Sequence, residues 1–233
     1  MPLLNGISKG LAVLVDPDKI GEKTNRLTDL MSQLPPTMIL VGGSTSTSIS
    51  DSFVNDLRER VGVPVILFPG NASQFTASAD GIFFLSLISG RNPEWLIGQQ
   101  VKAAKVVKSS GMEVIPVGYM LIESGGETAV QRVSHTEPIG RDAIELAVST
   151  ALAGELLGLQ AIYLEGGSGA KHPVPISMVK AVRQAVSVPI IVGGGLRSAE
   201  EVQSAWKAGA DLVVIGNALE QDPELYLRLI QSV

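Results

Sequence analysis

The sequence contains no cysteine and only two histidines among 233 residues. Disulfide bonds, a thiolate nucleophile and cysteine-ligated metals are therefore excluded. The two histidines, His135 and His172, are not spaced as zinc ligands are. Aromatic residues make up only 4% of the chain, so aliphatic side chains must fill any core. The net charge of −5 and the lack of a basic stripe argue against a nucleic-acid partner.

Long apolar runs are also missing. No run approaches the roughly 18 residues of a membrane-spanning helix. The first residues, Met1 to Gly6, lack the charged start and apolar stretch of a signal peptide. We therefore expect a cytoplasmic protein without a membrane anchor. Hydrophobic residues make up 45% of the chain, enough for the core of one large domain over residues 1–233.

Short β-branched runs alternate with longer helical stretches eight times along the chain. Most runs are continuously apolar, which is typical of parallel strands buried on both faces. The predicted strands are Leu11–Val15, Thr37–Val41, Val65–Phe68, Gly81–Leu85, Glu113–Val117, Ala161–Leu164, Pro189–Val192 and Leu212–Ile215. Eight such units in this length favour a closed (βα)8 TIM barrel over an open doubly wound sheet.

The helical stretches are predicted at Asp51–Arg60, Pro93–Ser109, Asp142–Gly158, Ile176–Val186, Ser198–Ala208 and Pro223–Ile230. Ser198, with a glutamate three residues later, indicates a capping box. The segment Gly70–Ala79 is too short for a full helix, so we expect the third helix of the barrel to be reduced to a loop or single turn. The segment from Ser124 to Arg141 is predicted to be a long loop, and such loops tend to be functional or mobile.

Glycines and small hydroxyl residues follow most of the predicted strands. In a TIM barrel these positions form the active-site face. Strand six ends in Glu165–Gly169, strand seven in Gly193–Arg197 and strand eight in Gly216-Asn217. Glycine lets the backbone approach a ligand and lets consecutive N–H groups converge on an anion. These three strand ends therefore predict a phosphate site, with a short extra helix over 218–220 facing it. Tight βα turns are the alternative.

Asp16 and Ser44 are the best candidates for metal ligands. Asp16 follows the first predicted strand, and its carboxylate can bind Mg²⁺ while the ion keeps waters and diphosphate oxygens. Ser44 follows the glycine pair of the second strand and can add a hydroxyl ligand, directly or through water. The alternative for Asp16-Pro17-Asp18 is an ordinary turn with a helix cap at Asp18.

Glu165 is the candidate base. Its position beside the glycine-rich loop allows it to take a proton from a hydroxyl on a small phosphorylated ligand. Tyr163 is two residues earlier and points to the same side of the strand. The alternative is a structural glutamate paired with a cation. Arg197 is expected to pair with phosphate or a carboxylate, or else to lie on the surface as a helix cap.

Five segments in this order resemble the geranylgeranylglyceryl phosphate synthase family of prenyltransferases, over nearly the whole chain. They are Val15–Lys19, Val41–Ser44, Tyr163–Ala170, Gly193–Arg197 and Ile215–Asn217. The Tyr-Leu-Glu-Gly run is the most specific of them, whereas the last two glycine motifs are shared by many phosphate-binding barrels.

The resemblance implies an enzyme that joins sn-glycerol 1-phosphate to a long polyprenyl diphosphate through an ether bond and releases diphosphate. Asp16 and Ser44 would hold Mg²⁺, and Glu165 would deprotonate the glycerol hydroxyl with Tyr163 helping to position it. The residues implied to bind glycerol phosphate are Tyr163, Leu164, Glu165, Gly166, Gly167, Ser168, Gly169, Gly194, Gly195, Gly216 and Asn217.

One position bears on the length of the prenyl chain. In the branch found in many Gram-positive bacteria a lysine lies two positions before the first aspartate, and here that position is Leu14. The sequence looks more like the branch shared by archaea and some other bacteria, so geranylgeranyl is the expected chain, with heptaprenyl as the alternative. An apolar tunnel would be lined by Phe68, Phe84, Leu85, Met120, Leu121 and Ile122, or these residues would simply pack in the core.

The stretch Asp142–Gly158 is apolar on more than one face, although an outer helix of a barrel needs only one apolar stripe. We therefore expect a homo-oligomer, dimer or hexamer, as the family resemblance also implies. Two other functions remain open. One is a lyase or isomerase acting on a phosphorylated small molecule, against which the absence of a lysine after strands three, four and five counts. The other is a non-catalytic protein that binds a phosphorylated metabolite.

Overall fold

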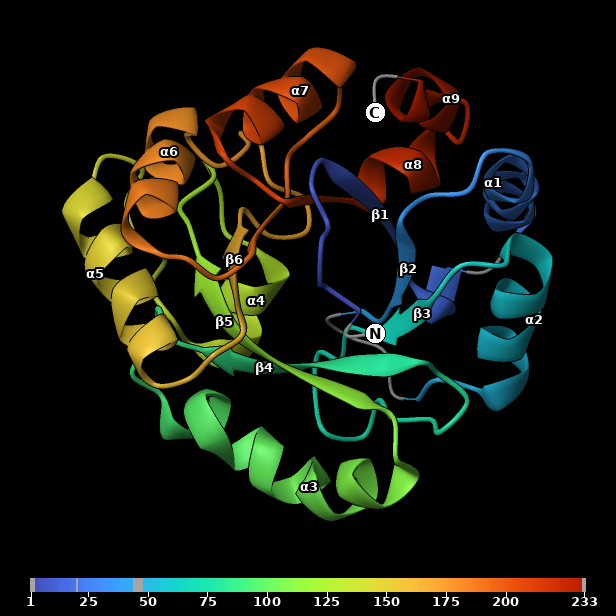
Figure 1. Ribbon diagram of the computed structural model, residues 1–233, viewed down its shortest axis with the longest axis horizontal. Helices are drawn as coiled ribbons and strands as arrows, with labels where there is room; N and C mark the ends of the chain where they lie inside the picture. The colour runs from blue at the N-terminus through green and yellow to red at the C-terminus, as the bar shows by residue number, and fades with distance from the viewer. Residues whose placement is uncertain (1–2, 20, 44–47, 232–233) are drawn as a thin grey trace.

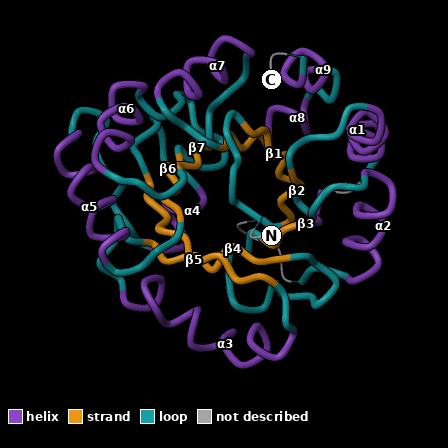
Figure 2. Tube along the Cα trace, viewed as in Figure 1, coloured by secondary structure: helices purple, strands orange, loops and turns teal. Residues whose placement is uncertain are grey.

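The computed structural model describes residues 3–19, 21–43 and 48–231, and its eight parallel strands form a closed barrel. The strands follow one another in sequence order, and β8 pairs with β1 to close the barrel. Helices surround the sheet on the outside (Figures 1 and 2). The predicted TIM barrel is confirmed. The strands are β1 Gly10–Val15, β2 Met38–Val41, β3 Val65–Leu67, β4 Gly81–Leu87, β5 Glu113–Leu121, β6 Ala161–Glu165, β7 Ile190–Gly193 and β8 Leu212–Ile215.

Apolar side chains of the strands form two layers, because successive residues of a strand point to opposite faces. One layer fills the barrel interior and includes Ala12, Leu40 and Tyr163. The other layer packs between the strands and the helices and includes Val13 and Ile39. The inward layer ends at the carboxyl ends of the strands, so residues there form the floor of any site at this face.

The longer helices pack against the outer layer, whereas Val130 of the short helix Ala129–Ser134 packs against the inward layer. The bounds of the helices are α1 Glu22–Gln33, α2 Asp51–Val61, α3 Gln99–Ser110, α4 Ala129–Ser134, α5 Ile144–Leu156, α6 Ile176–Ala185, α7 Ala199–Ala208, α8 Asn217–Gln221 and α9 Leu225–Ile230, with a 3-10 turn η1 Pro17–Lys19 and a π-helical turn η2 Glu94–Gly98. The predicted capping box is confirmed, because Ser198 and Glu201 cap the start of α7 reciprocally.

No helix lies between β3 and β4, where residues 68–80 are all described, so the predicted loss of the third helix is confirmed. The Gln74 side chain holds this segment by accepting a hydrogen bond from Gly70 N–H at 2.9 Å and donating one to the Gly43 carbonyl at 2.8 Å. β3 is short and pairs with β4 only at Ile66 and Leu67. The rest of β4 therefore has no β3 neighbour, and an opening remains at this point of the barrel.

β5 ends at Leu121, four residues beyond the predicted end at Val117. Pairing with β4 and β6 continues along it, which is why the backbone stays extended. The prediction of one long loop from Ser124 to Arg141 is wrong, because this segment contains the helix α4. The Thr128 side chain caps α4 by accepting the N–H of Gln131, so the threonine that looks loop-like in the sequence begins a helix.

Helix α5 turns its small residues toward the sheet and leaves large apolar residues exposed. Ala147, Ala151 and Gly154 are among its buried residues, whereas Leu146 is 52% and Leu156 is 85% exposed. The homo-oligomer expected from the apolar excess of this helix stays a prediction. Within the part of the chain that is described, no helix has both the length and the apolarity needed to span a membrane.

Candidate active site

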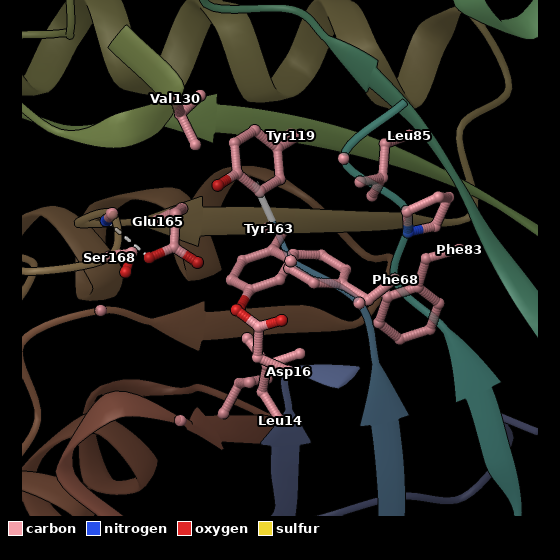
Figure 3. A pocket seen from close by; sticks show the side chains of 18 of the residues that line it. Leu14, Asp16, Phe68, Phe83, Leu85, Tyr119, Val130, Tyr163, Glu165 and Ser168 are labelled. Atoms are coloured by element: carbon pink, nitrogen blue, oxygen red, sulfur yellow. Dashed lines mark hydrogen bonds between the residues drawn. The ribbon is translucent and has the colours of Figure 1, made fainter. Parts of the chain in front are cut away.

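A pocket of about 430 Å³ opens at the carboxyl ends of the strands, within the ~300–1,000 Å³ typical of small-molecule sites. Its polar part lies at the ends of β1, β6, β7 and β8. Its mostly apolar part lies beside β4, β5 and α3. Figure 3 shows the Asp16 and Glu165 carboxylates projecting into this pocket from different strands. The pocket therefore brings together the two acidic residues that the sequence singles out.

Glu165 is the last residue of β6 and is only 6% exposed. Its Oε1 accepts a hydrogen bond from Gly167 N–H at 2.6 Å. Burial raises the pKa of Glu165 above its ordinary value of 4.5, and this outweighs the Gly167 N–H and the Tyr163 hydroxyl, which both lower the pKa. A buried carboxylate with a raised pKa is suited to accept a proton from a bound hydroxyl group.

Tyr163 packs between aromatic neighbours inside the barrel. Its ring centroid lies 5.3 Å from that of Tyr119 and 5.4 Å from that of Phe68. The hydroxyl is buried close to Glu165, yet it makes no hydrogen bond of normal geometry with the described residues. Burial, followed by the negative charge of Glu165, raises the pKa of Tyr163 well above its ordinary value. The tyrosine therefore stays protonated and can donate a hydrogen bond to a ligand or to Glu165.

The glycine-rich ends of β6 and β7 pack backbone against backbone. Gly194 has φ of +82°, and a Cβ there would lie 2.6 Å from Gly167 N and 2.7 Å from Gly166 N, besides meeting the Glu165 carboxylate. Gly167 also has a positive φ, of +92°. Only glycine tolerates both this conformation and this approach. Two backbone N–H groups thereby lie near the base, and Gly167 N–H donates to Glu165 while Gly166 N–H donates to the Gly193 carbonyl at 2.9 Å.

The loops after β6 and β8 are joined by their side chains. Asn217 Nδ2 donates a hydrogen bond to Ser168 Oγ at 2.8 Å. Asn217 is also the first residue of α8, so the short helix expected after β8 is present. The three glycine-rich strand ends therefore form one continuous wall of the pocket.

The exposed Arg197 donates its backbone N–H to Glu201 Oε2 at 2.6 Å, but no carboxylate among the described residues pairs with its guanidinium. Its guanidinium donates hydrogen bonds to the carbonyl oxygens of Ala170 at 2.6 Å, Gly195 at 3.1 Å and Lys171 at 3.2 Å. It thus ties the loop after β6 to the loop after β7. Its guanidinium therefore holds the two loops together, a role not expected from the sequence, and its pairing with phosphate stays a prediction.

Asp16 lines the pocket with a side chain that is 12% exposed. Its Oδ1 accepts a hydrogen bond from Asp18 N–H at 3.1 Å, so the carboxylate also shapes the turn after β1. Its Oδ2 lies 3.5 Å from Lys19 Nζ. Asp16 therefore stabilises the turn and lines the pocket at the same time, so its carboxylate can also contact a ligand. Ser44, the other predicted metal ligand, lies outside the described residues.

The apolar part of the pocket passes through the opening between β3 and β4. Phe83 and Leu85 face the barrel interior, whereas Ile82 and Phe84 face outward toward α3. All four line the pocket, together with Ala103 of α3. The pocket thus extends from the barrel interior to the outer side of β4, where the missing third helix leaves room.

Of the residues predicted to line a tunnel, Phe68, Phe84 and Leu85 do so. The prediction is wrong for Met120, Leu121 and Ile122, which are at most 1% exposed and pack in the core. Met120 and Leu121 continue β5 and pair with β6, so they belong to the sheet.

Tyr119 also lines the pocket, although it is not among the residues predicted from the sequence. The predicted strand ends at Val117, two residues before Tyr119. The apolar residues that continue to Ile122 are the sequence signal for a longer strand. In the barrel Tyr119 pairs with Tyr163 across β5 and β6. Burial and the charge of Glu165 raise its pKa well above the ordinary value.

Comparison with known proteins agrees with this architecture. The model of the PcrB family matches residues 9–233. A geranylgeranylglyceryl phosphate synthase from Flavobacterium johnsoniae is 51% identical over 220 residues, covering 94% of this chain and 90% of that protein. The protein of the same name from Pyrococcus abyssi is 44% identical, covering 89% and 83%.

A solved structure extends the likeness to three dimensions. It is (S)-3-O-geranylgeranylglyceryl phosphate synthase from Thermoplasma acidophilum in complex with sn-glycerol-1-phosphate. That structure matches with a TM-score of 0.91 and 31% sequence identity, covering 100% of this chain and 98% of the other. Family match, sequence identity and fold all agree over nearly the full length, and the chain belongs to the PcrB family.

Proposed function

We propose that this protein is a prenyltransferase that joins sn-glycerol 1-phosphate to geranylgeranyl diphosphate, forming an ether bond and releasing diphosphate. The observation that carries the proposal is the buried Glu165 at the edge of a glycine-built loop, in one pocket with Asp16. Family membership supports the same reaction, since relatives at 43–51% identity carry this enzyme name.

The glycerol phosphate binds at the polar end of the pocket in this proposal. Its phosphate accepts hydrogen bonds from N–H groups of the loops after β6, β7 and β8. Positive φ at Gly167 and Gly194 supports this assignment, because such a backbone conformation can turn successive N–H groups toward an anion. The residues assigned to this substrate are Tyr163, Leu164, Glu165, Gly166, Gly167, Ser168, Gly169, Gly194, Gly195, Gly216 and Asn217. Glu165 then takes the proton from the attacking hydroxyl, and Tyr163 positions that hydroxyl by a hydrogen bond.

The prenyl diphosphate occupies the other part of the pocket. Its apolar chain lies along the passage beside β4, where Phe84 and Ala103 line the wall. Its diphosphate lies near Asp16. The oxygen chemistry of this end fits Mg²⁺, which takes one or two carboxylates and keeps waters and phosphate oxygens. Asp16 and Ser44 would hold the ion, and when bound it would neutralise charge on the leaving diphosphate.

The proposal is tested by incubating the protein with labelled sn-glycerol 1-phosphate, Mg²⁺ and prenyl diphosphates of graded length. We expect a labelled prenyl ether, formed fastest from the geranylgeranyl donor. Faster reaction with the heptaprenyl donor would keep the reaction but change the chain length. No prenyl ether from any donor would reject the reaction and leave a lyase, an isomerase or a non-catalytic binding protein to be tested.

Asp16→Asn is expected to abolish the effect of Mg²⁺ on prenyl diphosphate binding. Asparagine keeps an oxygen that accepts the Asp18 N–H, so the turn is retained while the charge is lost. We expect affinity in Mg²⁺ to fall roughly tenfold or more, which corresponds to about 1.4 kcal/mol per factor of ten. Titration calorimetry with and without Mg²⁺ measures it.

Asp18→Asn is the matched control, because it removes the same charge from the same turn. Asp18 is exposed and does not line the pocket. The affinity of the Asp18→Asn variant for prenyl diphosphate, and the effect of Mg²⁺ on that affinity, should remain those of the native protein. Equal affinity of the native protein with and without metal would reject the role of Asp16.

A further inference from the structure

The charge of the pocket is at odds with the charge of its proposed ligands. Among the described residues that line it, four are carboxylates and two are cations, Lys19 and Arg197. Both proposed substrates are anions, and the diphosphate carries the larger charge. Backbone N–H groups are assigned to the glycerol phosphate, although the end of β8 at Gly216 also lies beside Leu14 of β1. A cation of the protein near Asp16 would therefore add to the charge that a metal ion supplies to the diphosphate.

Arg197 makes three of the five hydrogen bonds that a guanidinium can donate, but its position is fixed by the two loops that it joins. Three carbonyl oxygens accept its guanidinium protons, those of Ala170, Gly195 and Lys171. Moving it toward a ligand would leave these carbonyls without their donor and would separate the loops after β6 and β7. Hydrogen bonds to a charged donor are costly to break. Lys19 is the other cation of the pocket.

Lys19 is held between two carboxylates at the rim. Its Nζ lies 2.8 Å from Glu220 Oε2 and 3.5 Å from Asp16 Oδ2, and its side chain is 47% exposed. The backbone is fixed by Thr24, whose hydroxyl donates a hydrogen bond to the Lys19 carbonyl at 2.8 Å. Because an ammonium group has three protons, two acceptors leave one proton for a ligand. The group is thus placed beside the carboxylate that is proposed to hold the metal.

We propose that the Lys19 ammonium binds the diphosphate of the prenyl donor, with Glu220 as the residue that positions Lys19 before the donor arrives. This inference rests on the proposed function. A lysine is a compact point charge with rotatable donors, which suits a diphosphate whose oxygens rearrange as it leaves. Lys19 stabilises negative charge both on the bound donor and on the departing diphosphate. Glu220 acts only through Lys19 and does not touch the substrate.

The assignment predicts that loss of Lys19 affects donor binding far more than loss of Glu220. Lys19→Gln should raise the KM for geranylgeranyl diphosphate by about 10- to 100-fold, the range for a hydrogen bond to a charged group. The KM for glycerol phosphate should stay within about twofold. Lys19→Arg should recover part of the loss. Glu220→Gln should raise the donor KM by only a few-fold, because glutamine keeps an oxygen that accepts the Lys19 hydrogen bond and Lys19 itself remains.

Lys23→Gln is the charge-matched control. Lys23 lies on α1, donates a hydrogen bond to the Gln221 carbonyl at 2.9 Å and does not line the pocket. Its variant should keep both KM values. A Lys19→Gln variant that behaves like Lys23→Gln would overturn the inference. So would an equal rise in donor KM in Lys19→Gln and Glu220→Gln, which is the result expected of a purely structural ion pair.

A second measurement separates this inference from the proposed reaction. Inorganic diphosphate with Mg²⁺ should raise the Tm of the native protein and of Glu220→Gln, but raise that of Lys19→Gln much less. If the native protein forms no prenyl ether from any donor, the proposed function fails, and this measurement still decides the binding role of Lys19. Equal shifts in the native protein and in Lys19→Gln, including no shift in either, would overturn it.

Discussion

Glu165→Gln is expected to lower kcat by about 10²–10⁴-fold, the usual contribution of a general base. Glutamine keeps an oxygen that accepts the Gly167 N–H, so the loop after β6 should keep its shape. The affinity for glycerol phosphate should therefore stay within a few-fold. Steady-state kinetics give kcat, and calorimetry with sn-glycerol 1-phosphate gives the affinity. Unchanged turnover would remove Glu165 from the role of base.

The same variant should be more stable than the native protein at high pH. Burial raises the pKa of Glu165 above the 4.5 expected for the unfolded chain, so the folded protein binds this proton more tightly. The contribution of Glu165 to stability is thus fully present below pH 4.5 and is lost as pH rises through the raised pKa. The difference in Tm between variant and native protein should grow in favour of the variant as pH rises through this window. A difference in Tm that does not vary with pH would contradict the assigned shift.

Gly194→Ala is expected to abolish glycerol phosphate binding and to destabilise the barrel. The new Cβ would press on the backbone nitrogens of Gly166 and Gly167 and on the Glu165 carboxylate. Main-chain atoms in a closed sheet have little freedom to move aside. Positive φ and overpacking together should cost about 2–5 kcal/mol of unfolding free energy. Chemical denaturation measures the loss of stability, and calorimetry measures the loss of binding.

Gly158→Ala is the control for the backbone conformation alone. Gly158 follows α5 with φ of +87°, and a Cβ there meets nothing within 4 Å. Only the strain of the left-handed conformation is then expected, about 1–2 kcal/mol, with binding unchanged. Equal stability loss in the two variants would mean that the close contact at Gly194 is relieved by small movements. Retained binding in Gly194→Ala would show that the loop after β7 does not form the phosphate site.

The strand ends could be predicted because they depend on local pattern. Near-continuous apolar runs identify buried parallel strands, and a parallel barrel places the carboxyl end of every strand at the same face. Asp16 and Glu165, far apart in the sequence, were therefore expected at one site, and both line the same pocket. The bounds of a strand depend also on its neighbours in the sheet. β5 continues to Leu121 because β4 and β6 pair with it along its length, which no single run of residues reveals.

The partners of charged side chains could not be predicted. Arg197 donates to three carbonyl oxygens, and nothing in its neighbouring residues distinguishes this from a bond to phosphate. The sequence also predicts the missing third helix, but not the passage that its absence leaves beside β4. The passage from the barrel interior to the outer side of β4 arises from the short pairing of β3 and from the position of α3.

The sequence by itself determined the number and order of the strands, the loss of the third helix and the residue types at the rim of the barrel. These follow from the periodicity of apolar residues and from the few conformations that glycine-rich turns allow. Only the tertiary structure decided which rim groups touch. Lys19 meets Glu220 across 201 residues of chain, and Gly194 lies against the backbone at Gly166 and Gly167. Such contacts are non-local, since closure of the barrel and not the neighbouring sequence brings their atoms together.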